Sequence, residues 1–477
     1  MKYNVRVVSS FPPRLCGIGT YAENKLKGTQ RYTSEIGSIN VAAIDGHHSY
    51  DSLVDLVIRQ EDKNSWITAA KDIGQRALEK NSRGRIPTVV DINHEFGLGG
   101  RNWATENNYG PFLDTLRETP AFKKGLLYIV TTLHTILSNP TPHLKEVTRG
   151  LVEKSDATIV LSSLGKRILS SDVYSLDIDE NLIEHIEHGV RMDSYTTEEC
   201  AEIKESWSID KDVFTFVLPG LISSGKGIFD YTVPAYRKMV DELTQQGSKA
   251  RTRLIIRGKS HPDFERNPSF EEFVEQSRGA LLNSRLLLNP EDPFNEISFL
   301  RNIGRKTREN SHGIMFAYRP LSEEEYSGTF AGGDVPVFAY KGVEQISSGQ
   351  IVEAIGHGRA PISSKFWHAC EVLSPGNSGS IEDILNLKMP SEGEIIGMKD
   401  PNARGLLVDC DKGSQTIEQL ANCMVKYVQD PETLQLHRDN AREKGKTMTW
   451  DEIFGQNLKL FKRIRNRKLN EQQALHK

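Results

Sequence analysis

The sequence contains few cysteines and little net charge. Its 477 residues include only 5 cysteines, which are scattered and form no Cys-x-x-Cys pair. A disulfide framework is therefore not expected, and we predict a reducing, cytoplasmic location. The formal net charge is -4, and no strong basic field builds up along the chain. This balance argues against a nucleic-acid partner.

Long apolar runs and a targeting segment are also missing. No apolar run approaches the ~18 residues that a membrane-spanning helix needs, and the start "MKYNVRVVSS" has the pattern of a strand, without the charged-then-apolar pattern of a signal peptide. Low-complexity tracts and fixed-period repeats are absent as well. With 37% hydrophobic and 26% charged residues, the composition is typical of a globular protein that is not an integral membrane protein.

What the chain does contain is a repeated alternation of short β-branched runs and stretches of helical character, which predicts parallel sheets covered by helices on both faces. The expected strands of a first series lie at 4–8, 39–44, 86–92, 126–133 and 157–162. The expected strands of a second series lie at 213–220, 253–258, 284–289, 313–318, 335–340, 360–364 and 405–409.

Length and pattern together predict an α/β protein of two Rossmann-like, doubly wound domains that face a cleft. We expect an N-terminal domain at 1–195 and a C-terminal domain at 205–449, joined near 193–210. The terminal segment 450–477 has apolar residues at helical spacing and is expected to pack back on the first domain. Ligands of open parallel sheets bind beyond the carboxyl ends of the strands, so the loops there are the places to inspect.

The first such loop contains Gly17 and Gly19 in "GIGTYA", which formally matches the G-x-G-x-x-A dinucleotide fingerprint. Pro12 and Pro13 lie between the strand and the glycines, and two prolines do not suit the tight turn of that fingerprint. A longer glycine-rich loop that opens the first helix remains, where backbone N–H groups favour a negatively charged ligand. A purely structural role of these glycines in the turn explains the same sequence equally well.

A second informative stretch is "KGVEQISSGQIVEAIGHGRAPISS", residues 341–364. Ser347 or Ser348 suits a helix N-cap, and Gly349 begins a helix that Gly358 is placed to end. Small side chains and free N–H groups would let a diphosphate approach that helix end. Glu353, one turn further, suits the hydroxyls of a ribose, although a plain cap and a solvated glutamate explain the same residues.

The chain resembles the GT-B retaining glycosyltransferases of family four, which use nucleotide-sugar donors. The donor motif of that family has two glutamates flanking seven residues, and here the frame reads Gln345, seven residues and Glu353. Other motifs follow in the expected order between about residues 7 and 375, namely "NHEFGLGG" (93–100), "TTLHT" (131–135), "HGV" (188–190), "GLISSGKG" (220–227), "RGKSHP" (257–262) and "GVEQISSG" (342–349).

The resemblance implies a role for each matching residue. It places Gly17 and Gly19 beside the donor phosphates, His134 against the transferred sugar, and His94 and Glu95 on the acceptor side. It also implies that Lys226 neutralises the diphosphate together with the helix end at Ser347, Ser348 and Gly349. Glu353 would bind the donor ribose, and Gln345 would bind the hexose hydroxyls.

The implied activity is transfer of a hexose from a nucleotide-diphosphate sugar to the hydroxyl of a carbohydrate or lipid-linked acceptor. No cofactor is expected, because the nucleotide sugar is a substrate. The sequence offers no convincing Asp-x-Asp site for a divalent ion, and we therefore expect a metal-independent reaction. The family usually has an arginine where this chain has Leu221, and Arg257, Lys259 or Arg14 are candidate replacements.

Two alternatives stay open. Leu221 and the Gln345 exchange are compatible with a non-catalytic sugar-nucleotide binder or partner subunit, and the Gly17 fingerprint is compatible with an NAD-dependent enzyme. A further hypothesis concerns the basic residues of 459–468, which suit contact with an anionic membrane surface where a lipid-linked acceptor lies.

Overall fold

The computed structural model describes residues 2–45, 49–50, 52–81, 86–100, 102–176, 179–192, 195–288, 310–376, 382–383, 386 and 388–475. They form two compact units, of which unit 1 comprises Met1–Gly189 with Met448–Lys477, and unit 2 comprises Val190–Thr447. The first boundary falls at Gly189, a few residues before the position expected from the sequence. No helix within the described ranges is long and apolar enough to cross a bilayer.

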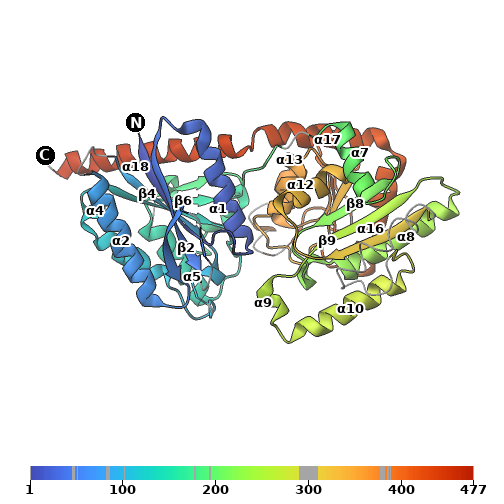
Figure 1. Ribbon diagram of the computed structural model, residues 1–477, viewed down its shortest axis with the longest axis horizontal. Helices are drawn as coiled ribbons and strands as arrows, with labels where there is room; N and C mark the ends of the chain where they lie inside the picture. The colour runs from blue at the N-terminus through green and yellow to red at the C-terminus, as the bar shows by residue number, and fades with distance from the viewer. Residues whose placement is uncertain are drawn as a thin grey trace. The chain divides into compact units, whose positions relative to one another are not determined.

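Unit 1 is built on a parallel sheet of seven strands in the order β3-β2-β1-β4-β5-β6-β7 (Figure 1). Its strands are β1 (Tyr3–Ser9), β2 (Ile36–Asp45), β3 (Val54–Arg59), β4 (Thr88–His94), β5 (Leu127–Leu133), β6 (Ala157–Val160) and β7 (Ile183–His185). Its helices are α1 (Gly17–Lys27), α2 (Lys63–Asn81), α3 (Tyr109–Glu118), α4 (Pro120–Lys123), α5 (Pro142–Lys154), α6 (Ser163–Leu169) and α18 (Trp450–Leu475).

The terminal helix α18 belongs to unit 1 and lies beside α1. Its apolar residues recur every three to four positions, so that Trp450, Phe454 and Phe461 face the sheet. These side chains share one core with Val5 and Val7 of β1. The burial of this apolar stripe explains why a helix so rich in charge folds against the domain.

Two strands of unit 1 have no counterpart among the predicted ones. β3 is an edge strand. Its exposed residues alternate with partly or fully buried ones, so its sequence lacks the long apolar run of a central strand. β7 has only three residues, too few for any periodic pattern to show.

Unit 2 is built on a parallel sheet of six strands in the order β10-β9-β8-β11-β12-β13. Its strands are β8 (Phe214–Pro219), β9 (Thr252–Gly258), β10 (His312–Tyr318), β11 (Val335–Phe338), β12 (Ile362–Ser364) and β13 (Leu406–Val408). Its helices are α7 (Thr197–Ser206), α8 (Val233–Gln245), α9 (Pro262–Glu265), α10 (Ser269–Asn283), α12 (Glu323–Gly332), α13 (Gly349–Gly356), α14 (Trp367–Leu373), α16 (Ser414–Gln429) and α17 (Pro431–Lys446).

Helices cover both faces of this sheet, as the sequence pattern predicts. Phe216 of β8 packs in one large core with residues of α8 and α16, whereas its neighbour Val217 packs in a separate core on the opposite face. The strand expected at 284–289 is not formed over 284–288, where only Leu287 makes a single bridge to Ile314. Residue 289 lies outside the described residues. Leu287 and Leu288 are used instead to pack against β10.

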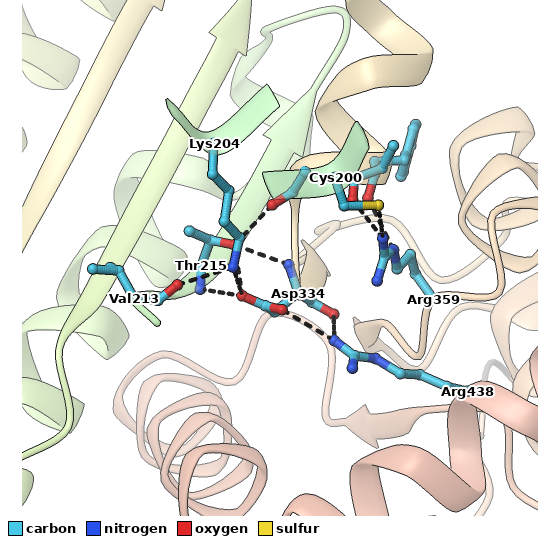
Figure 2. A network of polar contacts seen from close by, with 10 residues as sticks. Cys200, Lys204, Val213, Thr215, Asp334, Arg359 and Arg438 are labelled. Atoms are coloured by element: carbon cyan, nitrogen blue, oxygen red, sulfur yellow. Dashed lines mark hydrogen bonds and ion pairs between the residues drawn. The ribbon is translucent and has the colours of Figure 1, made fainter. Parts of the chain in front are cut away.

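A partly buried carboxylate ties four segments of unit 2 together (Figure 2). Asp334 accepts hydrogen bonds from Lys204 Nζ at 2.7 Å and from the backbone N–H of Thr215 at 2.8 Å, and Arg438 lies 3.3 Å from its other oxygen. Although burial opposes ionisation, the cations Lys204 and Arg438 keep the pKa of Asp334 below its usual value. The network therefore fixes α7 and α17 against the amino end of β11.

Both sheets reverse their strand order at one internal pair. In unit 1 the reversal lies between β1 and β4, and in unit 2 it lies between β8 and β11. In open parallel sheets a ligand-binding crevice forms beyond the carboxyl ends of the strands at such a reversal. The loops that follow β1, β4, β8 and β11 are therefore the ones that bear on function, and they carry most of the residues singled out in the sequence.

Candidate active site

The loop that follows β8 is held against the end of β9 by backbone contacts. Gly220 N–H donates to the carbonyl of Arg257 at 2.9 Å, and Ile222 N–H donates to that of Lys259 at 3.1 Å. Gly220 has φ +104, a conformation that favours glycine. The chain then makes a short 3-10 turn at Ser224–Lys226 and reverses at Gly227, whose φ is +59. This path brings Lys226 back to the reversal point of the sheet.

Lys226 is bound by two side chains from the β11–α13 segment. Its Nζ donates to the hydroxyl of Tyr340 at 2.7 Å and to Oε1 of Gln350 at 2.7 Å. The ammonium group also lies 3.9 Å from the centre of the Tyr340 ring, within the range of a cation–π contact. Gln350 is the second residue of α13, so the lysine lies at the first turn of this helix.

The environment of Lys226 disfavours its charge. Burial lowers the pKa of Lys226 to about 7, because the ammonium loses hydration and its two partners here are neutral. Burial also raises the pKa of Tyr340, and a hydrogen bond from Ser348 opposes that shift. The Tyr340 ring stacks on Phe366 with centroids 5.0 Å apart. The side chains that contact the Lys226 ammonium are thus neutral. An anion that binds beside it would favour the protonated form of the lysine.

Helix α13 begins and ends as its sequence predicts. The Ser348 side chain caps the helix by accepting from the Ile351 N–H, and Gly358 lies just past the end with φ +61. Ser348 N–H itself donates to Nδ1 of the buried His368 at 3.0 Å. Glu353 lies one turn further along α13, partly buried, where its charge contributes to the raised pKa of Tyr326.

Gln345 lies in the loop between β11 and α13, and its side-chain amide turns onto that loop. Nε2 donates to the backbone carbonyl of Ser347 at 2.8 Å, and the backbone carbonyl of Gln345 accepts from the His368 N–H at 3.1 Å. A further bond joins Trp367 N–H to the carbonyl of Val343 at 3.1 Å. The start of α14 therefore fixes the loop that carries Gln345, Ser347, Ser348 and Gly349.

The candidate replacements for the family arginine differ in their surroundings. Arg257 is buried, and its guanidinium contacts Thr329 Oγ1 at 3.0 Å and Glu325 at 3.5 Å; burial lowers its pKa to about 10. Lys259 is more exposed and lies 3.5 Å from Glu265. Leu221 itself has 43% of its surface exposed. Either cation would have to exchange an existing partner to bind a phosphate, so both roles stay predictions.

In unit 1, the loop after β1 is long. β1 ends at Ser9 and α1 begins at Gly17, with Cys16 as the N-cap residue. A Cβ at Gly19 would lie 3.3 Å from the backbone of Phe11, so this glycine permits a close approach, whereas Gly17 faces open space in the described part of the chain. Arg14 donates to the carbonyl of Ile44 at 3.0 Å. A loop of this length differs from the tight turn of a dinucleotide fingerprint.

His134 follows β5 and lies at the end of β4. Its backbone N–H donates to the carbonyl of His94 at 3.2 Å, and its Nε2 lies 3.4 Å from Asn93 Oδ1. The rings of His134 and Tyr21 pack edge to face, with their centroids 4.6 Å apart. Burial, followed by the nearby His188 and Lys25, lowers the pKa of His134 well below its usual value. The imidazole is therefore neutral at physiological pH.

His94 and Glu95 end β4 in different environments. His94 packs between Phe96 and Tyr109, and neither ring nitrogen has a hydrogen-bond partner among the described residues. Burial lowers its pKa to about 3. Glu95 accepts from Thr135 Oγ1 at 2.6 Å and from Phe96 N–H at 3.0 Å, while burial raises its pKa. His94 is thus a core residue of the loop, and Glu95 is its more accessible neighbour.

Sequence reasoning missed a buried ion pair beside His134. Lys25 of α1 lies 2.7 Å from Asp91 of β4, and each side chain is only 1% exposed. Lys25 also lies 5.9 Å from the centre of the Tyr21 ring. Buried charges of this kind survive only as pairs. No sequence signal distinguishes Lys25 from the many surface lysines, although Asp91 does interrupt an apolar strand.

Most basic residues of the terminal helix contact acidic residues or carbonyls of unit 1. Lys462 pairs with Glu35 at 2.6 Å, Arg463 pairs with Glu184 at 2.5 Å, and Lys468 pairs with Asp156 at 2.7 Å. Arg467 donates to the carbonyl of Asp156 at 2.7 Å. These contacts give the charges a role within the domain.

Comparison with known proteins extends only to structures. No protein-family model matches the sequence, and no curated protein matches it. Among solved structures, an α,α-trehalose-phosphate synthase (UDP-forming) from Burkholderia xenovorans in complex with glucose-6-phosphate has a TM-score of 0.58 at 12% identity, covering 97% of this chain and 100% of that one.

Two further structures are similar over nearly the same length. An E. coli protein described as trehalose-6-phosphate bound with UDP-2-fluoro glucose has a TM-score of 0.55 at 11% identity, covering 97% of this chain and 99% of its own. The catalytic domain of starch synthase IV from Arabidopsis thaliana, bound to ADP and acarbose, has a TM-score of 0.57 at 11% identity, with 98% and 99% covered. The chain has the GT-B fold, which confirms the fold expected from the resemblance; membership of family four stays a prediction.

Proposed function

We propose that this protein transfers a hexose from a nucleotide-diphosphate sugar to an acceptor hydroxyl, with retention at the sugar carbon and without a metal ion. The observation that carries the proposal is the position of Lys226, at the first turn of α13 and at the strand reversal of unit 2. A cation and a helix N-terminus together suit a diphosphate. The similar structures named above hold UDP-2-fluoro glucose or ADP, which agrees with such a donor.

The proposed transfer reaction requires few groups beyond a cation and a helix N-terminus at the diphosphate. The bond between the sugar carbon and the diphosphate oxygen breaks, the acceptor oxygen bonds to the same carbon from the same face, and the acceptor proton goes to a diphosphate oxygen. Fixed positive charge and N–H donors at the leaving diphosphate lower the barrier. In this proposal Lys226 and α13 supply them, Glu353 binds the ribose, and Gln345 binds the hexose.

The residues of unit 1 complete the proposal. A neutral His134 suits hydrogen bonding to the transferred sugar better than proton transfer, because its pKa lies well below the physiological range. Gly17 and Gly19 would let the backbone approach the donor phosphates, and His94 and Glu95 would lie on the acceptor side. The acceptor is a carbohydrate, a sugar phosphate or a lipid-linked sugar; one similar structure is a complex with glucose-6-phosphate.

The direct test is binding followed by turnover. We expect UDP, GDP or ADP to raise the melting temperature of the purified chain, and NAD to leave it unchanged. With the matching nucleotide sugar and candidate acceptors, mass spectrometry should detect a glycosylated product, and NMR should show an unchanged anomeric configuration. Activity that persists in EDTA would support metal independence, and inversion of the anomer would contradict retention.

Variants locate the activity in the proposed site. Lys226→Ala and Glu353→Ala should each lower turnover by about 100-fold or more, because each removes a contact to the donor. Glu418→Ala, a surface change on α16, is the matched control and should retain activity. Full activity in both site variants would contradict the proposal.

A second candidate function is a non-catalytic sugar-nucleotide binder, which the exposed Leu221 favours at the position of the family arginine. Nucleotide binding without any turnover across a broad panel of acceptors would support it, and turnover by the purified chain would exclude it.

A cytoplasmic location with peripheral membrane contact through 459–468 is also proposed. If changing the basic residues of 459–468 to glutamine, which leaves the core residue Phe461 in place, does not reduce co-sedimentation with anionic liposomes, this contact is wrong.

A further inference from the structure

Gln350 makes three side-chain contacts that converge on the lysine site. Its Oε1 accepts from Lys226 Nζ at 2.7 Å and also from the Tyr340 hydroxyl. Its Nε2 donates to the carbonyl of Pro219, the last residue of β8. Both ends of the amide are thus satisfied, and each end contacts a different segment of unit 2.

These contacts determine which way the amide faces. The carbonyl of Pro219 can only accept, so the NH₂ group of Gln350 must lie on that side and the oxygen must lie toward Lys226. The amide packs closely against the backbone of Gly220, because a Cβ on this glycine would lie 2.5 Å from Gln350 Nε2. Few other side chains combine an acceptor and a donor at this spacing, and a leucine of similar size offers neither.

We propose that Gln350 and Tyr340 are positioning residues that hold the Lys226 ammonium where the donor diphosphate binds. This inference rests on the proposed function. The four side-chain dihedrals of the lysine would otherwise let the ammonium sample many positions, and ordering it would cost conformational entropy. With two acceptors already in place, most of that ordering is complete before the diphosphate arrives.

The charge of Lys226 follows from the groups around it. Among the described residues near the lysine, the titratable and charged groups include Tyr340 and Lys341 after β11, Tyr326 on α12, Glu353 on α13 and Asp230 before α8. The tyrosines are neutral because burial raises their pKa values, and Lys341 pairs with Asp230 at 2.8 Å. Burial is then the main influence on Lys226 and lowers its pKa to about 7. The ammonium is charged below that pH and loses its proton above it.

The test uses the full chain and measures binding of UDP-, GDP- and ADP-glucose by calorimetry between pH 6 and 8.5, a range in which the diphosphate of a nucleotide sugar does not ionise. The wild type should bind more weakly as the pH rises through about 7, and Lys226→Met should bind weakly at every pH. Gln350→Leu removes the acceptor and should weaken binding by about tenfold at pH 6.5, with its pH midpoint moved lower.

Gln350→Glu separates positioning from mere packing. A carboxylate beside Lys226 raises the pKa of the lysine, so the ammonium stays charged across the range and the profile becomes flat. Its affinity at pH 6.5 should still be lower, because the carboxylate offsets the ammonium. Tyr340→Phe should weaken binding several-fold and serves as the second probe if a Gln350 variant fails to fold. Gln276→Leu on α10, which removes an exposed glutamine, is the control.

Three outcomes decide the matter. Weaker binding with a shifted or flattened pH profile in the Gln350 variants supports the inference. Wild-type affinity and profile in folded Gln350→Leu, Gln350→Glu and Tyr340→Phe overturn it while leaving the proposed function standing. If the wild type binds none of the nucleotide sugars, the proposed function fails and the positioning role fails with it.

Discussion

The backbone of Gly258 lies directly against that of Gly220. A Cβ added at Gly258 would lie 1.7 Å from the Gly220 carbonyl oxygen, and Gly258 has φ +153. Gly258 is the last residue of β9, and Gly220 directly follows β8. Their contact sets the path of the loop that leads to Lys226. The geometry of the lysine site thus depends on a close approach that only glycine permits.

Gly258→Ala should therefore destabilise unit 2 by about 2–4 kcal/mol, since the backbones must separate and the loop must shift. Urea unfolding with a probe in unit 2 measures the change, and nucleotide binding should weaken in the same variant. Gly279→Ala is the control, because a Cβ at Gly279 meets nothing within 4 Å in the described part of the chain. Its helical position predicts a gain of about 0.5–1 kcal/mol. Equal stabilities of the two variants would contradict the account.

Most of the two sheets was predictable from sequence, because buried parallel strands are continuous β-branched runs. The exceptions have physical reasons. β3 is half exposed at an edge, β7 is too short, and the leucines near 287 pack without forming a ladder. The capped start of α13 was predictable for a different reason, since Ser348 is a local signal that does not depend on the rest of the fold.

The site was only half predictable. Lys226 lies in a recognisable glycine-rich loop, but its partners Tyr340 and Gln350 lie 114 and 124 residues further on. Hydrogen bonds over such separations leave no pattern in a single sequence. Similarly, nothing near Lys25 indicates that it pairs with Asp91 across the core. The sequence does reveal Leu221 where the resemblance expects a cation, and the structure adds that this side chain is exposed.

Leu221→Arg tests whether the lost cation can be restored. An arginine on this loop would reach a diphosphate at α13 and should tighten nucleotide-diphosphate binding by about tenfold, which corresponds to about 1.4 kcal/mol. The gain should shrink at high salt, as expected for a partly exposed charge. Leu436→Arg is a matched control, since both leucines have 43% of their surface exposed. Isothermal titration of both variants at two salt concentrations measures the effect, and an equal gain in both would point to a non-specific charge effect.

His94→Phe tests the cost of burying an imidazole without a hydrogen-bond partner. The pKa of His94 is lowered to about 3 in the folded protein, whereas an unfolded histidine titrates near ~6.5. Below that value the unfolded state binds more protons, so the wild type loses about 1.4 kcal/mol per pH unit through this group as the pH falls toward 4.

The phenylalanine variant lacks this loss and keeps the ring contacts with Phe96 and Tyr109. Its stability relative to the wild type should therefore rise as the pH drops from 7 to 5, whatever its difference at pH 7. Urea unfolding at several pH values measures the slope. The same slope in both proteins would mean that His94 becomes protonated in the folded state.

The last prediction concerns the Lys25–Asp91 pair. Each side chain is only 1% exposed, and the two charged groups are 2.7 Å apart. Lys25→Met should destabilise unit 1 by about 3–5 kcal/mol, since it leaves a buried carboxylate unpaired, and Asp91→Leu should cost a similar amount for the opposite charge. The double variant buries no charge at all. We expect it to be more stable than either single variant, so that the double-mutant cycle shows a coupling of several kcal/mol. Urea unfolding of the four proteins at pH 7 completes the cycle, with Lys27→Met, on the exposed side of the same helix, expected to change stability by less than about 0.5 kcal/mol. Additive losses would mean that water or another group already compensates each charge separately, and the pair would then have no special role beneath His134.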